Sequence, residues 1–175
     1  KGLPLLLQSW ASVIARHPNT LLLLVGAGGV GLQNCEAKLR SFVEENSLEE
    51  SVRFAGSVNN VHQYLQASDF FIFPSEREAF GISVIEALAC GVPVITTVTG
   101  GIRDIVTDQE NALVVPVTDE KALGRAIETV LQGGDAGKSM THSARLLATD
   151  RYSERKILQL YSQLVADLAT VEAHG

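Results

Sequence analysis

The chain has 175 residues, which is the size of a single domain. Hydrophobic residues make up 46% of it and charged residues 19%, which is typical of a soluble globular protein and excludes an intrinsically disordered chain. The net charge is −6 and Lys and Arg nowhere form a run. Nucleic-acid binding is therefore disfavoured, because it requires a concentrated basic patch.

The cysteine and histidine content argues against disulfide and metal sites. Cys35 and Cys90 stand alone, which fits a reducing compartment, so we expect a cytoplasmic protein. The four histidines are scattered without the spacing of metal ligands, and we expect no metal site. Apolar runs fall well short of the ~20 residues that a membrane span needs. The opening residues, 1–4, are no signal peptide, and we expect the chain to begin inside a longer protein.

Short apolar runs alternate with amphipathic stretches along the chain. Strands are expected at 21–25, 52–55, 70–73, 94–95 and 113–115, and helices at 3–16, 33–46, 61–67, 83–89 and 120–131. The apolar runs lack polar alternation, as in strands buried on both faces of a parallel sheet. The alternation predicts a Rossmann-like α/β fold, a parallel sheet with helices on both faces. From about residue 135 the pattern is helical, and we expect 1–175 to form one domain.

A glycine-rich segment follows the first expected strand. Residues 26–31 read Gly-Ala-Gly-Gly-Val-Gly, a match to the G-x-G-x-x-G fingerprint of dinucleotide sites. Such a site also needs an acid at the end of the next strand to hold a ribose hydroxyl. The strand at 52–55 ends in Gly-Ser-Val-Asn instead, which weakens the hypothesis of an NAD-dependent oxidoreductase. A tight turn that packs strand on helix, or a loop that faces a substrate cleft, remain as alternatives.

Glu86 is the only charged residue between Phe80 and Ile102. We expect its helix to pack through the apolar residues Ile82, Ile85, Leu88 and Ala89, which leaves Glu86 little access to bulk water. An unpaired buried carboxylate costs several kcal/mol, so a partner is required. A pair of sugar hydroxyls would satisfy Glu86 as donors. The alternative is an ordinary exposed glutamate on a helix.

Glu78 lies in the loop before this helix, which is expected to begin near Gly81. The free N–H groups and the dipole of a helix N-terminus favour an anion such as a diphosphate. The segment thus offers an anion-binding position and two carboxylates, although a loop glutamate can equally be a solvated charge. A glycosidase also uses two carboxylates, but it gives the anion-binding position no purpose.

At this point the residues resemble a known family. Glu78 and Glu86, with seven residues between them, resemble the E-x7-E motif of retaining glycosyltransferases of the GT-B fold, and most closely the large family-four group. Further similar segments follow the order of that family at 54–58, 67–69, 73–75, 78–81, 86–87, 91–95, 100–101 and 111–112. The resemblance covers about residues 1–131.

The resemblance implies that the chain is the C-terminal, nucleotide-sugar-binding half of a GT-B enzyme. The reaction is then transfer of a hexosyl group from a UDP-, GDP- or ADP-linked sugar to an acceptor hydroxyl with retained configuration. Enzymes of this kind use neither a metal ion nor a cofactor. The partners implied are the nucleotide sugar and an N-terminal acceptor domain absent from this chain, and peripheral membrane association through that half is left open.

The resemblance also implies roles for the residues around the motif. Glu86 would bind the ribose hydroxyls of the donor, and Glu78 would hold hydroxyls of the transferred sugar as the catalytic residue. The backbone of Phe80, Gly81 and Ile82 would face the sugar and the diphosphate.

Residues outside the motif complete the implied donor site. Lys1 would neutralise the diphosphate leaving group, and Val58 would lie near the base. Gly26 and Gly28 would line the cleft, so that the apparent dinucleotide loop becomes the glycine turn of this family.

Some positions depart from the family pattern. Ala79 and Ala112 stand where glycine is usual. The strand and the arginine that precede the lysine in the family are missing before Lys1, so we expect weakened diphosphate binding, a sheet that lacks a strand, and a fragment that is inactive alone. A non-catalytic nucleotide-sugar-binding module and a nucleotide-sugar epimerase stay open as alternatives. The epimerase requires catalytic acids and a histidine, and no motif in the sequence assigns these roles to particular residues.

Overall fold

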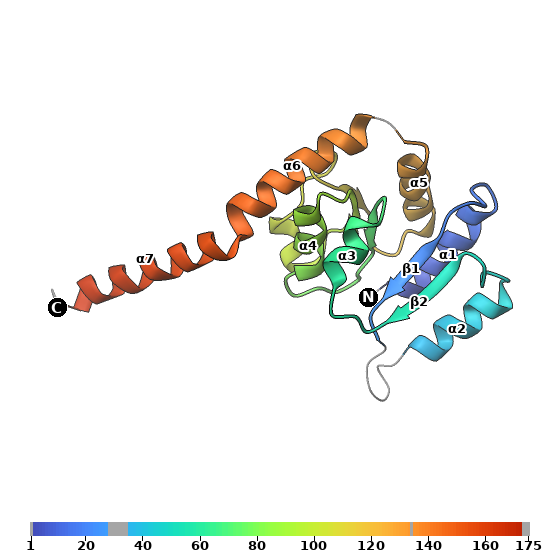
Figure 1. Ribbon diagram of the computed structural model, residues 1–175, viewed down its shortest axis with the longest axis horizontal. Helices are drawn as coiled ribbons and strands as arrows, with labels where there is room; N and C mark the ends of the chain where they lie inside the picture. Colours follow the sequence, from blue (N-terminus) through green and yellow to red (C-terminus); the bar gives the residue numbers. More distant parts are fainter. Residues whose placement is uncertain (1, 28–34, 134, 173–175) are drawn as a thin grey trace.

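The computed structural model describes residues 2–27, 35–133 and 135–172 of an α/β protein, in which helices flank parallel strands (Figure 1). This confirms the predicted fold class. Two residues of the expected donor site, Lys1 and Gly28, lie outside the described residues.

Most elements lie within a few residues of their expected positions. The helices are α1 (Leu3–Ile14), α2 (Glu36–Glu45), α3 (Val61–Gln66), α4 (Ile82–Cys90), α5 (Glu120–Leu131), α6 (Asp135–Tyr152) and α7 (Glu154–Glu172). The strands are β1 (Leu22–Val25), β2 (Val52–Gly56), β3 (Phe71–Phe73), β4 (Val94–Thr97) and β5 (Leu113–Val115). A 3₁₀ helix, η2 (Gly100–Asp104), follows β4 and was not expected.

The described strands divide into two parallel sheets, where a single sheet was expected. β1 pairs with β2, with Leu22 opposite Val52. β4 is the central strand of the second sheet, between β3 and β5, so that Ile95 lies opposite both Ile72 and Leu113. The strand that the resemblance places before Lys1 stays a prediction. All five strands are parallel within their sheets, and ligands of such folds bind beyond the carboxyl ends of the strands.

The first hydrophobic core lies around α1, which packs on α5. Leu7, Trp10 and Val13 repeat at the spacing of one helix face and are at most 1% exposed. Leu123 and Ile127 of α5 are fully buried in the same cluster. The indole N–H of Trp10 donates to Ser51 Oγ at 3.3 Å, which satisfies the polar atom of this buried ring.

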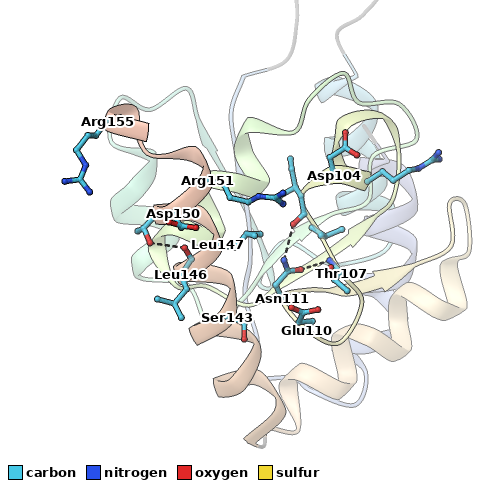
Figure 2. A pocket seen from close by; sticks show the side chains of 14 residues that line it. Asp104, Thr107, Glu110, Asn111, Ser143, Leu146, Leu147, Asp150, Arg151 and Arg155 are labelled. Carbon is cyan, nitrogen blue, oxygen red and sulfur yellow. Dashed lines mark hydrogen bonds between the residues drawn. The ribbon is translucent and has the colours of Figure 1, made fainter. Parts of the chain in front are cut away.

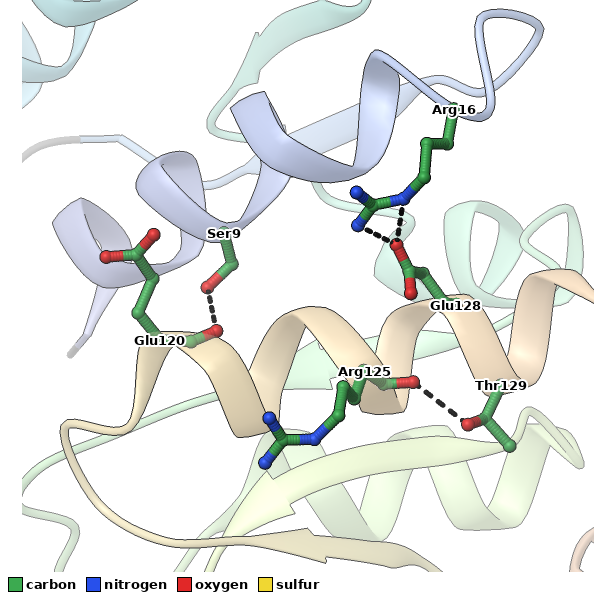
Figure 3. A network of polar contacts seen from close by, with 6 residues as sticks. All are labelled: Ser9, Arg16, Glu120, Arg125, Glu128 and Thr129. Carbon is green, nitrogen blue, oxygen red and sulfur yellow. Dashed lines mark hydrogen bonds and ion pairs between the residues drawn. The ribbon is translucent and has the colours of Figure 1, made fainter.

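Polar contacts accompany the packing of α1 on α5 (Figure 3). Ser9 Oγ donates to the Glu120 carbonyl oxygen at 3.0 Å, and Arg16 Nε donates to Glu128 Oε1 at 2.7 Å. Exposed ion pairs contribute at most about 1 kcal/mol. The apolar interface therefore holds the two helices together, and the polar contacts help to fix their register.

The second core lies around α4, which packs on α6. Val84, Ala87 and Leu88 of α4 are fully buried, and Ala144 and Ala148 of α6 face them in the same cluster. These small side chains let the two helices approach closely. α4 is thereby held between α6 and the three-stranded sheet, with which it shares the second core.

Beyond Tyr152 the chain enters α7, which extends away from the body of the molecule (Figure 1). Seven of its large apolar side chains are exposed, namely Ile157, Leu158, Leu160, Tyr161, Leu164, Val165 and Leu168. Within the described part of the chain, no helix is long and apolar enough to span a bilayer.

Candidate donor site

The loop that follows β3 is hydrogen-bonded to the end of β4 and to the residues just after it. Ser75 is fully buried, and its carbonyl oxygen accepts hydrogen bonds from Thr97 Oγ1 at 2.5 Å and from Thr99 Oγ1 at 3.2 Å. Its hydroxyl donates to the carbonyl oxygen of Arg77 at 3.0 Å. The segment that leads to Glu78 therefore leaves the sheet in a defined direction.

Two glycines of η2 allow its backbone to approach the backbone of this loop closely. An added Cβ at Gly100 would lie 1.6 Å from the Glu78 carbonyl oxygen, and one at Gly101 would lie 2.9 Å from the carbonyl oxygen of Ala79. The N–H of Gly101 donates to the same Ala79 oxygen at 3.0 Å. Only glycine permits this approach. The Gly-Gly pair has no predicted role, although a glycine pair just after a strand is a signal of close backbone contact.

The N-terminus of α4 opens at the end of this loop, as expected. Gly81 is the N-cap with φ 96°, and it offers no side chain to cap the helix. Its carbonyl oxygen accepts from Val84 N at 2.9 Å and from Ile85 N at 3.3 Å. The first N–H groups of a helix have no partner within the helix, and together with the helix dipole they attract an anion.

The expected burial of Glu86 is wrong, because the structure leaves this residue exposed. α4 packs through Val84, Ala87 and Leu88, whereas Ile82 is 63% exposed. The helix is apolar on nearly every side, so periodicity alone did not fix which side would pack. Glu86 lies one turn after Ile82 on the exposed side of the helix.

Glu78 and Phe80 complete the exposed edge formed by the loop and the first turn of α4. The Glu78 side chain is half-buried, and its Oε1 accepts the N–H of Ala79 at 3.1 Å. Phe80 is 50% exposed. We call this region the α4 edge, residues 78–86. It presents two carboxylates, two exposed apolar side chains and an uncapped helix N-terminus.

The start of the chain lies against Pro74, the residue that follows β3. An added Cβ at Gly2 would lie 1.8 Å from the Pro74 carbonyl oxygen, and Gly2 has φ 70°. The residue next to Lys1 is therefore packed on the end of β3, four residues before Glu78. The role expected of Lys1 itself stays a prediction.

Gly26 and Val58 belong to the other sheet. The N–H of Gly26 donates to the Gly56 carbonyl oxygen at 2.8 Å, and nothing lies within 4 Å of the position of an added Cβ. Val58 is half-buried, two residues after the end of β2. Both residues lie just beyond the carboxyl ends of their strands, as expected for a ligand site, and their contact with a base or a diphosphate stays a prediction.

The pKa of the Cys90 thiol depends on the charge of Glu86, which lies on the same helix. Cys90 lies one turn after Glu86. Burial raises the pKa of the Cys90 thiol, the Glu86 carboxylate raises it further, and Arg145 opposes both effects. The Glu86 carboxylate is therefore close enough to affect the ionisation of the Cys90 thiol.

The described residues also form an open cavity of about 780 Å³ between α6 and the segment that follows η2 (Figure 2). None of the predicted site residues lines it. Its charged lining residues are Arg103, Asp104, Glu110, Asp150, Arg151 and Arg155. Acids and arginines are equal in number, so the cavity has no clear preference for an anion. Among the described residues, no cluster of His, Cys, Asp and Glu could hold a metal ion.

Comparison with known proteins gives the family. The model of the family described as "Glycosyl transferases group 1" matches residues 1–147. The D-inositol 3-phosphate glycosyltransferase of Corynebacterium urealyticum is 31% identical, and the match covers 100% of this chain and 42% of that relative. The chain thus spans less than half the length of the curated relatives that it matches, for example 42% of this one.

Solved structures of other proteins have a similar fold. The Anabaena protein HepE, solved in complex with UDP, has a TM-score of 0.87 and 24% identity over 95% of this chain and 45% of that one. The C-terminal domain of a glycosyl transferase group 1 family protein from Francisella tularensis has a TM-score of 0.80 and 20% identity, over 88% of this chain and 80% of that one. The chain has the fold of the C-terminal domain of a GT-B glycosyltransferase, and it belongs to the glycosyl transferases group 1 family.

Proposed function

We propose that this chain is the donor-binding domain of a retaining glycosyltransferase, which transfers a hexosyl group from a nucleoside diphosphate sugar to an acceptor hydroxyl. The observation that carries the proposal is the α4 edge. An isoleucine that is 63% exposed and a phenylalanine that is 50% exposed flank an uncapped helix N-terminus, with one carboxylate on each side of it. A ligand that is part apolar ring, part hydroxyl and part anion matches these three features.

The two carboxylates divide the donor between them. Glu86, exposed on the side of α4, binds the ribose hydroxyls, which donate to its two oxygens. Glu78, in the loop, holds hydroxyls of the transferred sugar and stabilises the positive charge that develops there in the transition state. Its bond with Ala79 N keeps the carboxylate near the loop backbone.

The diphosphate lies at the N-terminus of α4, with the backbone of Phe80, Gly81 and Ile82 beside it. The helix dipole stabilises the departing charge, and Lys1 adds a positive charge, which accounts for catalysis without a metal ion or a cofactor. Gly26, Gly28 and Val58 line the nucleoside side of the cleft. The packing of Gly2 on Pro74 supports the placement of Lys1, because it brings the start of the chain to the end of β3.

An N-terminal acceptor domain completes the enzyme, and this chain alone is inactive in transfer. The exposed apolar residues of α7 support such a partner, because a helix that projects from the body gains stability when a second domain covers it. A structure of the whole protein in which α7 contacts only residues of its own domain would contradict this part of the proposal.

The test is a calorimetric titration of the chain with UDP, GDP, ADP and NAD in the absence of metal. We expect saturable binding of one nucleoside diphosphate, which Glu86→Gln weakens by about 1–3 kcal/mol, the usual effect of losing a charged hydrogen bond. Glu78→Gln is the matched control in the same edge, and it should leave nucleotide binding nearly unchanged while it impairs transfer in the whole enzyme.

Each outcome of this titration decides one part of the proposal. Equal effects of the two substitutions on plain nucleotide binding would contradict the division of roles. Tight NAD binding would favour an oxidoreductase instead. A whole enzyme that binds the sugar nucleotide without transferring the sugar would favour a non-catalytic binding module.

A further inference from the structure

Tyr152 connects the end of α6 to the α4 edge. It is the last residue of α6, immediately before the single residue that separates α6 from α7. Its side chain is half-buried and packs against the second core. No pattern in the sequence singled it out, because an aromatic residue at the end of a helix is most simply a packing residue.

The ring and the hydroxyl of Tyr152 reach two different parts of the site. The ring lies edge-on to Phe80, with the ring centroids 6.4 Å apart and the planes at 80°. The hydroxyl donates to the carbonyl oxygen of Asp104, the last residue of η2, at 3.3 Å. One side chain therefore touches both the loop that carries Glu78 and the 3₁₀ helix beneath that loop.

These contacts bear on the side chain of Phe80, since its backbone already packs against Gly101. Half of its side chain is exposed, so burial alone does not select one position. Its neighbours are fixed mainly through backbone contacts, since Gly101 N donates to Ala79 O and the Cβ position of Gly81 lies 2.8 Å from Ile102 Cγ1. An edge-to-face contact with a second aromatic ring adds a preferred geometry to this position.

We propose that Tyr152 is a positioning residue of the donor site, which holds Phe80 and the first turn of α4 in place through its ring. The proposal rests on the proposed function, because it assigns Phe80 to the part of the edge that faces the sugar and the diphosphate.

The binding test compares Tyr152→Leu with Tyr152→Phe in the 175-residue chain. Tyr161→Leu is the matched control. It is the same substitution away from the site, because Tyr161 lies on α7 and is 64% exposed. Each protein is titrated with the nucleoside diphosphate that the unmodified chain prefers and with the corresponding nucleoside. We expect Tyr152→Leu to weaken diphosphate binding about fivefold, within the range for loss of an aromatic pair, and to leave nucleoside binding unchanged.

The Tyr152→Phe variant distinguishes a positioning role of the ring from a general effect on stability. Tyr152→Phe keeps the ring and loses only the bond to Asp104, so it should bind within about twofold of the unmodified chain. Loss of nucleoside and diphosphate binding by the same factor would overturn the proposal, as would a Tyr152→Phe variant as weak as Tyr152→Leu.

Hydrogen exchange in the ligand-free chain tests the proposal without any nucleotide. The amides of Gly101 and Val84 donate to the carbonyl oxygens of Ala79 and Gly81, so their exchange rates report on the loop. Tyr152→Leu should accelerate both, and Tyr161→Leu should accelerate neither. An unmodified chain that binds no nucleotide contradicts the proposed function alone. Unchanged exchange at Gly101 and Val84 in Tyr152→Leu overturns the role of Tyr152 whatever the chain binds.

Discussion

The two sheets are built from similar apolar strands but reach different environments. All four residues of β4 are buried, and its Thr96 and Thr97 hydroxyls donate to the carbonyl oxygens of Phe73 and Ser75 at 2.9 and 2.5 Å. On β1, Leu23 is 40% exposed and Val25 is 39% exposed. The difference follows from pairing, because β4 lies between two strands while β1 has one partner among the described strands.

This difference separates the proposed site into two parts. The α4 edge follows β3 of the three-stranded sheet, and its loop packs closely on Gly100 and Gly101 within this chain. Gly26 and Val58 follow the strands of the two-stranded sheet, which exposes apolar side chains that a further partner would cover. We therefore expect the diphosphate and ribose contacts to be better organised in this chain than those of the base.

The largest expected contrast is between two glycines, one from each part. Gly100→Ala should lower the free energy of unfolding by about 4 kcal/mol, because the added Cβ meets the Glu78 carbonyl oxygen 1.6 Å away at a φ of 54°. Gly26→Ala should cost about 1–2 kcal/mol, because its φ of 127° is unfavourable but its surroundings are open. Urea denaturation of both variants measures the difference, and equal losses would contradict the closer packing beneath the α4 edge.

The next contrast is between two strand residues. Ile95→Ala in β4 should cost about 3 kcal/mol, since the side chain is fully buried and leaves a cavity. Leu23→Ala in β1 should cost about 1 kcal/mol, since 40% of the residue is already exposed. Thermal unfolding followed by circular dichroism compares the two. A Leu23→Ala loss as large as that of Ile95→Ala would indicate that another surface covers β1 in solution.

The smallest effect concerns the Cys90 thiol, whose pKa is raised first by burial and then by Glu86. Because the folded protein holds this proton to a higher pH than the unfolded chain does, the associated stability is present at neutral pH. It is lost as pH rises through the alkaline range in which the thiol ionises. Alkylation of the Cys35→Ser variant as a function of pH measures the midpoint. Glu86→Gln should move that midpoint downward, and an unmoved midpoint would contradict the closeness of the two groups.

Local sequence signals predicted the elements well. α5 has the expected bounds, 120–131, because its start is encoded by a capping residue, Asp119, whose Oδ1 accepts the N–H of Ala122 at 2.8 Å. Gly81 and Gly91 mark the two ends of α4, each with a positive φ. Signals of this kind act over a few residues, so the sequence alone reveals them.

Long-range packing decided what the sequence could not predict. The predicted burial of Glu86 was wrong because Ile82 and Leu88 are equally apolar, and only packing against α3, α6 and β4 decides which of them is covered. The contact of Tyr152 with Phe80 joins residues far apart in the chain and has no local signal. The positions of Lys1 and Gly28 lie outside the described residues, and their roles stay predictions.

The packing of α1 on α5 also has a consequence for the order of events during synthesis. The bond from Ser9 to Glu120 spans 111 positions, and the apolar face of α1 meets Leu123 and Ile127 still later in the chain. At ordinary translation rates the ribosome takes on the order of ten seconds to cover this distance. The side of α1 that packs on α5 therefore stays uncovered until α5 has been made, whereas Trp10 meets Ser51 much earlier in synthesis.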